Sequence, residues 1–298
     1  MRVLVTGGSG LLGAELVRQL SGKEEVLAVS RSGAQNTYMC DLRNASETAA
    51  LFQNASFDLV IHTAAYSDVD GCERNPEEAY RSNALATRYL AEECLSRHIP
   101  LVYVSTDYVF DGQKRSPYTE EDPTCPINVY GMTKLAGEHY AGKLGPLCAI
   151  VRTSWLFGRG NPNSFVNAIV ARLENEKEVG VLDDQEDAPT DVKDLAGALR
   201  KAGEYLTGGK NKGRRDAGVS LFHFCNSGSA TRYAMALKIK EFLGLKGVEV
   251  KRVDRKGVTG RLALRPRYGV MSTRRYEAVF GEKPRSWEEG LREYLCGS

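Results

Sequence analysis

A short glycine-rich loop near the start of the chain constrains its fold more than any other feature. Gly7, Gly10 and Gly13 follow the apolar run Val3-Leu4-Val5, and leucines and valines recur at helical spacing over 11–20. This order predicts a strand, a tight turn and a helix. In such a unit the glycines allow the turn, the approach of a pyrophosphate to the backbone, and close packing of helix on strand. The loop therefore predicts a dinucleotide site; the alternative is a glycine turn in an α/β domain without a ligand.

The first half of the chain alternates between strand and helix patterns. Strands are predicted at 3–5, 26–29, 38–40, 58–62, 100–105 and 148–152, and helices at 46–53, at 74–97 and around Tyr130. Each crossover between parallel strands must return over the sheet, so both faces become covered. The pattern predicts an α/β fold with a Rossmann-type doubly wound parallel sheet.

The second half is less regular. Helices are predicted at 162–174, 191–206, 229–243 and 286–296, and short strands at 178–182, 221–225 and 248–252. We expect an NAD(P)-binding domain over 1–153 and a smaller substrate-binding lobe over 154–298, with the chain crossing between the lobes. The segment 208–218 is rich in glycine and charge, which is typical of a mobile loop.

Composition excludes several classes of protein. The 298 residues carry 40 basic and 38 acidic side chains, and the one basic run, 210–215, has no interleaved aromatic residue, so nucleic acid is not an expected partner. The seven cysteines form no Cys-x-x-Cys pair, which favours reduced thiols and a cytoplasmic setting, with Cys148 and Cys225 in the core. A strand starts at once, leaving no room for a signal peptide, and no apolar run approaches the roughly 20 residues of a membrane span.

The ends of the predicted strands supply the remaining cofactor residues. After the second strand stands Ser30-Arg31-Ser32 in place of an acidic residue, and an arginine there pairs with a 2′-phosphate. This favours NADPH, with NADH as the alternative if Arg31 is an ordinary surface residue. The predicted cofactor-binding residues are Gly7, Ser9, Gly10, Leu11, Leu12, Gly13, Arg31, Asp41, Leu42, Ala64, Ala65, Tyr66, Ser105, Tyr130 and Lys134.

Two pairs of residues predict the reaction. Tyr130 and Lys134 stand at helical positions i and i+4, so the ammonium can lie beside the phenol and favour its ionised form. Ser105 and Thr106 end the fifth strand, at the edge where open α/β sheets hold ligands. A hydroxyl that polarises a carbonyl, beside a phenol that protonates it, predicts carbonyl reduction. The alternatives are a surface helix pair and a helix cap.

Longer segments resemble a known family. Ser105-Thr106-Asp107-Tyr108-Val109-Phe110, Tyr130-Gly131-Met132-Thr133-Lys134 and Arg152-Thr153-Ser154-Trp155 are similar to the dTDP-4-dehydrorhamnose reductase family of extended short-chain dehydrogenases/reductases, over nearly the whole chain. The resemblance implies reduction of the C4 keto group of dTDP-4-dehydrorhamnose to give dTDP-L-rhamnose. It implies Tyr130, Lys134 and Thr106 as catalytic residues, and Thr106, Asp107, Tyr130 and Trp155 as substrate-binding residues.

Other residues of the resemblance carry weaker expectations. Trp155 is expected to face the nucleotide-sugar, or else to be a buried indole beside the sixth strand. Asp68 and Asp70 are expected to bond sugar hydroxyls, or else to be solvated loop residues. Asn83 resembles the superfamily's helix asparagine, which bonds backbone and helps to relay protons. Leu135 and Leu144 lie outside the catalytic face and favour a homodimer, with a monomer as the alternative.

The chain also departs from the family pattern. Glu15 matches one of the glutamates that bind Mg²⁺ in some members, but Lys193 stands near where another is expected, so no metal site is predicted. Gly269 follows Arg265-Pro266-Arg267-Tyr268 where a serine or threonine is usual, so part of the nucleotide-sugar contact is expected to differ.

Two alternative functions share this scaffold. A nucleotide-sugar epimerase or dehydratase would use the same Tyr130 and Lys134, but Asp107 is followed by Tyr108 and not by the glutamate that elimination requires. A non-catalytic regulatory subunit resembling the β subunit of methionine adenosyltransferase would share the run from Ser105 to Gly112. Fold does not separate a binder from an enzyme.

Overall fold

The structure, a computed structural model, describes residues 1–159, 164–208, 218–253 and 261–297. A seven-stranded parallel sheet in the order β11-β6-β5-β4-β1-β2-β3 forms its centre. The order reverses between β1 and β4, where a doubly wound sheet leaves a crevice for ligands. The predicted fold class is confirmed. The strands are β1 (Arg2–Thr6), β2 (Glu25–Ser30), β3 (Tyr38–Met39), β4 (Leu59–His62), β5 (Leu101–Thr106), β6 (Cys148–Thr153) and β11 (Ser220–His223).

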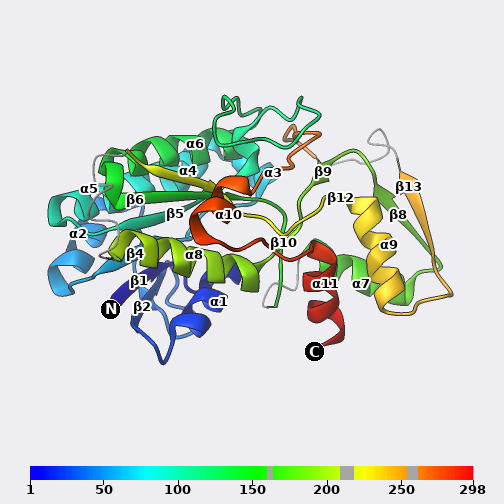
Figure 1. The fold of residues 1–298 in the computed structure, drawn as a ribbon, viewed down its shortest axis with the longest axis horizontal. Coiled ribbons are helices and arrows are strands. Elements are labelled where there is room, and N and C mark those ends of the chain that lie inside the picture. Colours follow the sequence, from blue (N-terminus) through cyan, green and yellow to red (C-terminus); the bar gives the residue numbers. More distant parts are fainter. Residues whose placement is uncertain (160–163, 209–217, 254–260, 298) are drawn as a thin grey trace.

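Helices cover both faces of this sheet (Figure 1). Along β1, Val3 and Val5 pack against the layer formed by α1 and α8, whereas Leu4 packs against the layer of α2 and α5. A strand buried on both faces reads as a continuous apolar run, which is what the sequence shows. The long helices are α1 (Leu11–Leu20), α2 (Ala45–Asn54), α5 (Ala86–Arg97), α6 (Val129–Ala141) and α8 (Val192–Thr207).

The helices predicted around 74–97 are confirmed, and they follow one another directly. They consist of α4 (Pro76–Tyr80), a π-helical turn (Arg81–Leu85) and α5. Single π turns are frequent at functional sites, and this one carries the buried Asn83. Other short helices are α3 (Val69–Arg74), α10 (Arg274–Phe280) and two 3-10 segments, Asp107–Val109 and Gly142–Leu147.

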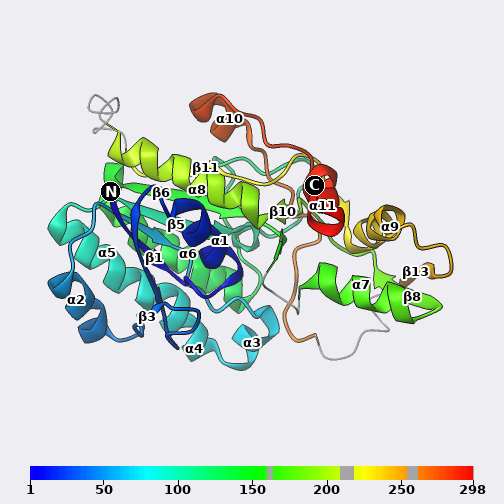
Figure 2. The ribbon, with the colours of Figure 1, turned by 90° about the horizontal axis from the view of Figure 1, so that it is seen from below.

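A smaller lobe lies beyond the carboxyl ends of the central strands (Figures 1 and 2). Its core packs α7 (Phe165–Asn175), α9 (Arg232–Phe242) and α11 (Trp287–Cys296) against the strand pair β8 (Glu178–Leu182) and β13 (Glu249–Val253). Two further short strand pairs are β7 (Leu156–Phe157) with β10 (Thr190–Asp191) and β9 (Glu186–Asp187) with β12 (Ala230–Thr231). Between these segments the chain crosses back to the large domain, where it forms α8 and the sheet strand β11. The domain boundary near residue 153 stays a prediction.

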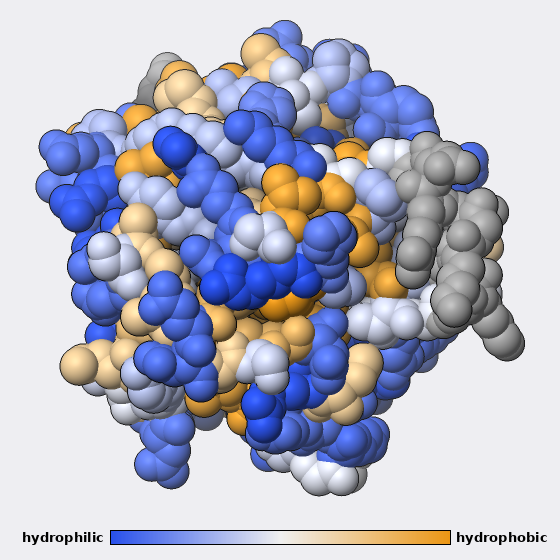
Figure 3. Space-filling view, turned by 90° about the vertical axis from the view of Figure 1, so that its left-hand side faces the viewer, coloured by the Kyte–Doolittle hydropathy of each residue, from blue (hydrophilic) through white to orange (hydrophobic). Residues whose placement is uncertain are grey.

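Several surface and core expectations can be compared with the structure. Cys148 and Cys225 are buried, as predicted. Leu144 is also buried, in the core beside β6, so the expectation that it supports a dimer surface is wrong. Most of the loop predicted at 208–218 lies outside the described residues. None of the described helices is long and apolar enough to span a membrane. On the face shown in Figure 3, hydrophilic residues predominate and hydrophobic residues form smaller patches between them.

Candidate active site

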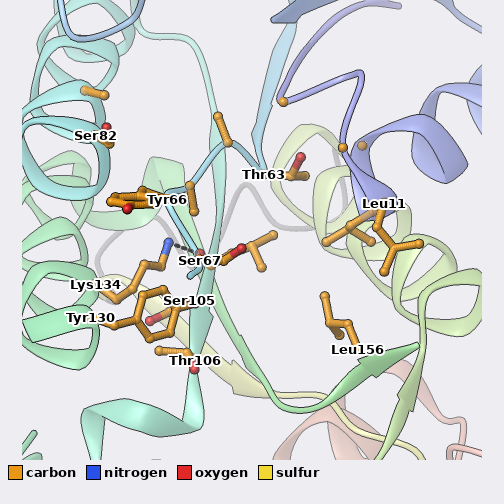
Figure 4. A pocket seen from close by; sticks show the side chains of 18 of the residues that line it. Leu11, Thr63, Tyr66, Ser67, Ser82, Ser105, Thr106, Tyr130, Lys134 and Leu156 are labelled. Carbon is orange, nitrogen blue, oxygen red and sulfur yellow. Dashed lines mark hydrogen bonds between the residues drawn. The ribbon is translucent and has the colours of Figure 1, made fainter. Parts of the chain in front are cut away.

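A cavity of about 900 Å³ lies at the carboxyl ends of the central strands. The residues that the sequence predicts for catalysis and cofactor binding line this one cavity, as do Thr106, Asp107, Tyr130 and Trp155 of the predicted substrate site, whereas Asp68 and Asp70 are not among its lining residues. Figure 4 shows Tyr130, Lys134 and Thr106 on one side and Leu11 and Leu156 on the other. The structure therefore brings the predicted site residues together, from segments spread over the first half of the chain.

The glycine loop forms one end of the cavity by close backbone packing. A Cβ on Gly13 would lie 2.1 Å from the carbonyl oxygen of Gly7, so only glycine allows α1 to start this close to the loop. The helix begins at Leu11, directly after Gly10. Its first amides have no partner within the helix and are suited to bind the negative charge of a pyrophosphate.

Two arginines lie near the predicted position of the adenosine ribose. Arg31 is 66% exposed, and its guanidinium lies 3.5 Å from the Glu78 carboxylate. Arg43, which the sequence analysis missed, also lines the cavity and pairs with both Asp41 and Glu78. The Arg43 hydrogen bonds lower the pKa of Asp41. Asp41 is therefore held by an arginine, and its predicted contact with adenine would have to coexist with that ion pair.

Tyr130 and Lys134 both lie on α6; Lys134 is buried, and Tyr130 is half-buried. Burial lowers the pKa of Lys134 to about 7, and its Nζ donates to the carbonyl oxygen of Val104 at 2.7 Å. Burial raises the pKa of the Tyr130 phenol, the charge of Asp107 raises it further, and a hydrogen bond with Thr106 opposes both. The acidifying effect of Lys134 on this phenol stays a prediction.

Two hydroxyl groups at the end of β5 face the same space. The Ser105 hydroxyl is buried and has no hydrogen-bond partner within the protein. Thr106 Oγ1 accepts from the Tyr108 amide at 3.2 Å and lies 2.9 Å from Asp107 Oδ1. The strand end thus presents one hydroxyl without a partner and one shared with a carboxyl group.

Asn83 braces the loop after β4. Its side chain accepts from the Tyr66 amide at 2.7 Å and donates to the Tyr66 carbonyl at 3.1 Å. The same amide group donates to the Thr133 hydroxyl at 3.0 Å, on the helix that carries Tyr130. The expected backbone bonds of Asn83 are confirmed, and its part in a proton relay stays a prediction.

An aromatic and cationic wall closes the far end of the cavity. Trp155 follows β6 with a φ of +42°, in the left-handed region, and its ring stacks with Phe165. The Arg232 guanidinium lies 4.8 Å from the centre of each ring. Trp155 Nε1 and Arg232 Nε are buried without a hydrogen-bond partner, so this wall offers two donors to a ligand.

The loop carboxylates have partners within the protein. The Asp68 side chain caps α3 by accepting from the Gly71 amide, and Asp70 forms an ion pair with Arg265. The Arg265 hydrogen bond lowers the pKa of Asp70 to about 2. The expectation that these two carboxylates bind sugar hydroxyls is therefore not supported, because both are already engaged.

The residues considered for Mg²⁺ are also engaged. The Glu15 carboxylate accepts hydrogen bonds from Arg18 and Gln19, and Lys193 pairs with Glu293. Within the described parts of the chain, no group of three or more His, Cys, Asp or Glu side chains is placed to hold a metal ion.

Sequence reasoning missed several residues of the cavity. Some of them follow strand ends, and could have been found from the rule that parallel strands hold ligands at their carboxyl ends. Arg232 has no local sequence signal, because its position depends on how the smaller lobe packs. The missed residues include Ser32, Arg43, Thr63, Ser67, Glu78, Ser82, Thr153, Leu156 and Arg232.

Comparison with known proteins places the chain in a family. The model of the RmlD substrate binding domain matches residues 1–297. The chain belongs to this family. It is 36% identical to a Streptomyces griseus protein named dTDP-4-dehydrorhamnose reductase, covering 99% of this chain and 94% of that protein. It is 35% identical to the Bacillus subtilis spore coat polysaccharide biosynthesis protein SpsK, covering 99% of this chain and 96% of that protein.

Family membership extends to the three-dimensional structure. A crystal structure of dTDP-4-dehydrorhamnose reductase from Bacillus anthracis in complex with NADP superposes with a TM-score of 0.88. The two chains are 31% identical, and the match covers 100% of this chain and 99% of the other. The whole of the chain, including the smaller lobe, thus shares this family's architecture.

Proposed function

We propose that this protein is an NADPH-dependent reductase that converts the C4 ketone of dTDP-4-dehydrorhamnose to the alcohol of dTDP-L-rhamnose. The observation that carries the proposal is the convergence of Tyr130, Lys134 and Thr106 in one cavity with the glycine loop. The near-complete alignment with proteins named dTDP-4-dehydrorhamnose reductase supports the choice of substrate.

The cavity suits a dinucleotide. The start of α1 offers amides for the pyrophosphate, and the unpartnered Ser105 hydroxyl faces the space beside Tyr130. Arg31 would pair with the 2′-phosphate of NADPH, and its exposed side chain is free to do so once Glu78 is displaced. When bound, the nicotinamide supplies a hydride to the carbonyl carbon.

The protein's own groups handle the proton and the charge. The Tyr130 hydroxyl donates its proton to the ketone oxygen, and the Thr106 hydroxyl donates a hydrogen bond that fixes the carbonyl. The Lys134 ammonium favours the phenolate that remains, and it would hold the ribose of the bound cofactor. Hydride on carbon and the Tyr130 proton on oxygen together give the alcohol.

The opposite wall suits a nucleotide diphosphate. Arg232 lines the cavity, each of Arg232 and Arg261 has one buried guanidinium nitrogen without a hydrogen-bond partner, and burial lowers the pKa of both. The Arg232 charge also lowers the pKa of Arg261. Like charges held together out of water favour a bound anion. We assign Arg232 to the diphosphate and Trp155 to the sugar or base. The S. griseus and B. anthracis relatives are named as reductases, which favours reduction over a regulatory binder or an elimination enzyme.

A substrate panel tests the proposal. NADPH and NADH oxidation are measured with dTDP-4-dehydrorhamnose and with other nucleotide-linked ketosugars. Tyr130→Phe is expected to lower turnover at least about 100-fold while NADPH still binds, as for loss of a general acid. Tyr80→Phe is the matched control, because Tyr80 is an exposed tyrosine outside the cavity. NADPH binding without oxidation by any ketosugar would favour the regulatory alternative.

A further inference from the structure

Two buried carboxyl groups meet directly behind Thr106. Asp107 is 2% exposed and Asp187, at the end of β9, is 1% exposed. Asp107 Oδ2 and both carboxyl oxygens of Asp187 are buried and have no hydrogen-bond partner in the protein. Since the two side chains come from different lobes, the sequence shows no sign that they lie together.

Gly269 provides the space for this pair. A Cβ at this position would lie 2.0 Å from Asp187 Oδ1 and 2.7 Å from Asp107 Oδ2. The two carboxyl groups therefore approach the same point beside the Gly269 backbone. The departure of Gly269 from the serine or threonine usual in the family has a physical reason here, because any side chain would force Asp187 away.

Such a pair does not carry two negative charges at neutral pH. Burial raises the pKa of Asp107, and the charge of Asp187 raises it further. Burial also raises the pKa of Asp187, which Arg232 partly opposes. Two carboxylates in one enclosed site retain a proton between them. The titratable and charged groups that face the pair are Tyr108, Tyr130, Glu186, Cys225 and Arg232.

The protonation state of Asp107 decides where the Thr106 hydrogen points. A hydroxyl has one donor and two acceptor positions, and the Tyr108 amide occupies one acceptor position of Thr106. An ionised Asp107 only accepts, so it would take the single Thr106 hydrogen in a strong, charge-assisted bond. An uncharged Asp107 either donates to Thr106 or offers a weaker, neutral acceptor.

We propose that Asp187 is a positioning residue that shares a proton with Asp107, so that Asp107 stays uncharged and the Thr106 hydroxyl is free to donate to the ketone oxygen. The inference rests on the proposed function only in naming that ketone. Keeping Asp107 uncharged has a second effect, because its negative charge would hinder ionisation of Tyr130.

Asp187→Asn tests the role of the pair. The amide removes one charge and donates to Asp107, which favours the Asp107 carboxylate. Turnover of dTDP-4-dehydrorhamnose at neutral pH is expected to fall about tenfold, less than the roughly 10²- to 10³-fold loss on removing an oxyanion-hole donor, because the Thr106 hydroxyl is still present. The wild-type turnover falls as pH rises and the pair loses its proton. In the variant this fall is expected to move at least about one unit lower in pH. Wild-type turnover and an unmoved profile would overturn the proposal.

Two comparisons separate positioning from general damage. Glu186→Gln removes the neighbouring carboxylate of the same strand, which bonds Ser229. Because its charge raises the Asp187 pKa but it is not a member of the pair, its pH profile is expected to shift clearly less than that of Asp187→Asn. In a Thr106→Ala background, Asp187→Asn is expected to change turnover less than about twofold. Both substitutions remove the same interaction, the hydrogen bond from the Thr106 hydroxyl to the ketone oxygen, so the second has little left to remove. Independent, multiplicative losses would show that Asp187 does not act through Thr106.

Gly269→Ala provides a variant that keeps both carboxyl groups. Gly269 has no left-handed φ, so alanine fits its backbone but forces Asp187 from Asp107. The fall in turnover is expected to move to lower pH, as in Asp187→Asn; an unmoved profile would count against the pair.

Infrared titration of the protein without substrate separates the two proposals. A protonated carboxyl band is expected to persist to neutral pH in the wild type and to disappear at lower pH in Asp187→Asn. Absence of this band would overturn the acid pair, whereas a wild-type protein that shows the band but reduces no ketosugar would overturn only the proposed function.

Discussion

The two ends of the cavity are built in different ways. The end at β1 and β2 consists of backbone amides and small residues from consecutive strand-to-helix turns, such as Gly7 to Gly13. The end at the smaller lobe consists of two large side chains, the aromatic Trp155 and the charged Arg232, from segments far apart in the sequence. In the proposed function, the first end would bind the pyrophosphate that all dinucleotides share, and the second would bind one class of substrate.

This difference indicates how each end can change. A site made by close backbone packing fails on steric grounds when a single atom is added, because backbone cannot move aside cheaply. A site made by side chains on a packed lobe can lose or gain a contact while the fold persists. We expect substitutions at the first end to affect cofactor binding strongly and those at the second end to affect substrate affinity selectively.

The largest effect is expected for Gly13→Ala. The added Cβ would lie 2.1 Å from the Gly7 carbonyl oxygen, so the loop must shift away from the pyrophosphate. Overpacking of about 1–3 kcal/mol corresponds to a loss of NADPH affinity of about 5- to 150-fold, measured by fluorescence titration. Gly197→Ala is the control: its Cβ would approach nothing closer than 3.9 Å, and unchanged binding is expected. Equal behaviour of the two variants would contradict the packing argument.

A smaller and more selective effect is expected for Arg232→Gln. Loss of the guanidinium is expected to raise KM for the nucleotide-sugar about tenfold, as for one charge-assisted hydrogen bond, with little change in NADPH affinity. Arg292→Gln is the matched control, because Arg292 also lies over an aromatic ring, 4.5 Å from the centre of Phe242, but outside the cavity. If steady-state kinetics gave the same KM for both variants, Arg232 would not bind the diphosphate.

The smallest effect is expected for Arg31→Ala. The exposed guanidinium contributes modestly, so KM for NADPH is expected to rise about fivefold, whereas KM for NADH stays unchanged because NADH lacks the 2′-phosphate. Arg88→Ala, which removes an exposed arginine paired with Glu92, serves as the control. A parallel rise for both cofactors would refute the assignment of Arg31, and would point to Arg43 as the phosphate ligand.

The sequence predicted most of the residues at the cofactor end of the cavity and few of those at the end formed by the smaller lobe. The glycine loop, the end of β5 and the Tyr130 helix are local patterns, and the rule that parallel strands end at one sheet edge brings them together. Arg232 and Asp187 have no such pattern. Their positions follow from the packing of α9 and β9, and short strands such as β9 are set by contacts distant in sequence. Leu144 was misjudged for the same reason, because burial under a neighbouring helix is not visible from an isolated turn.

By itself the sequence determined the parallel sheet, the nucleotide-binding turn and the pairing of Tyr130 with Lys134, since each depends on residues within about one turn or one strand of each other. Only the tertiary structure decided the meeting of Asp107 and Asp187 beside Gly269 and the place of Arg232 against Trp155. Local preferences fix elements, but the desolvation and repulsion that shift a carboxyl group's protonation arise only when distant segments enclose it together.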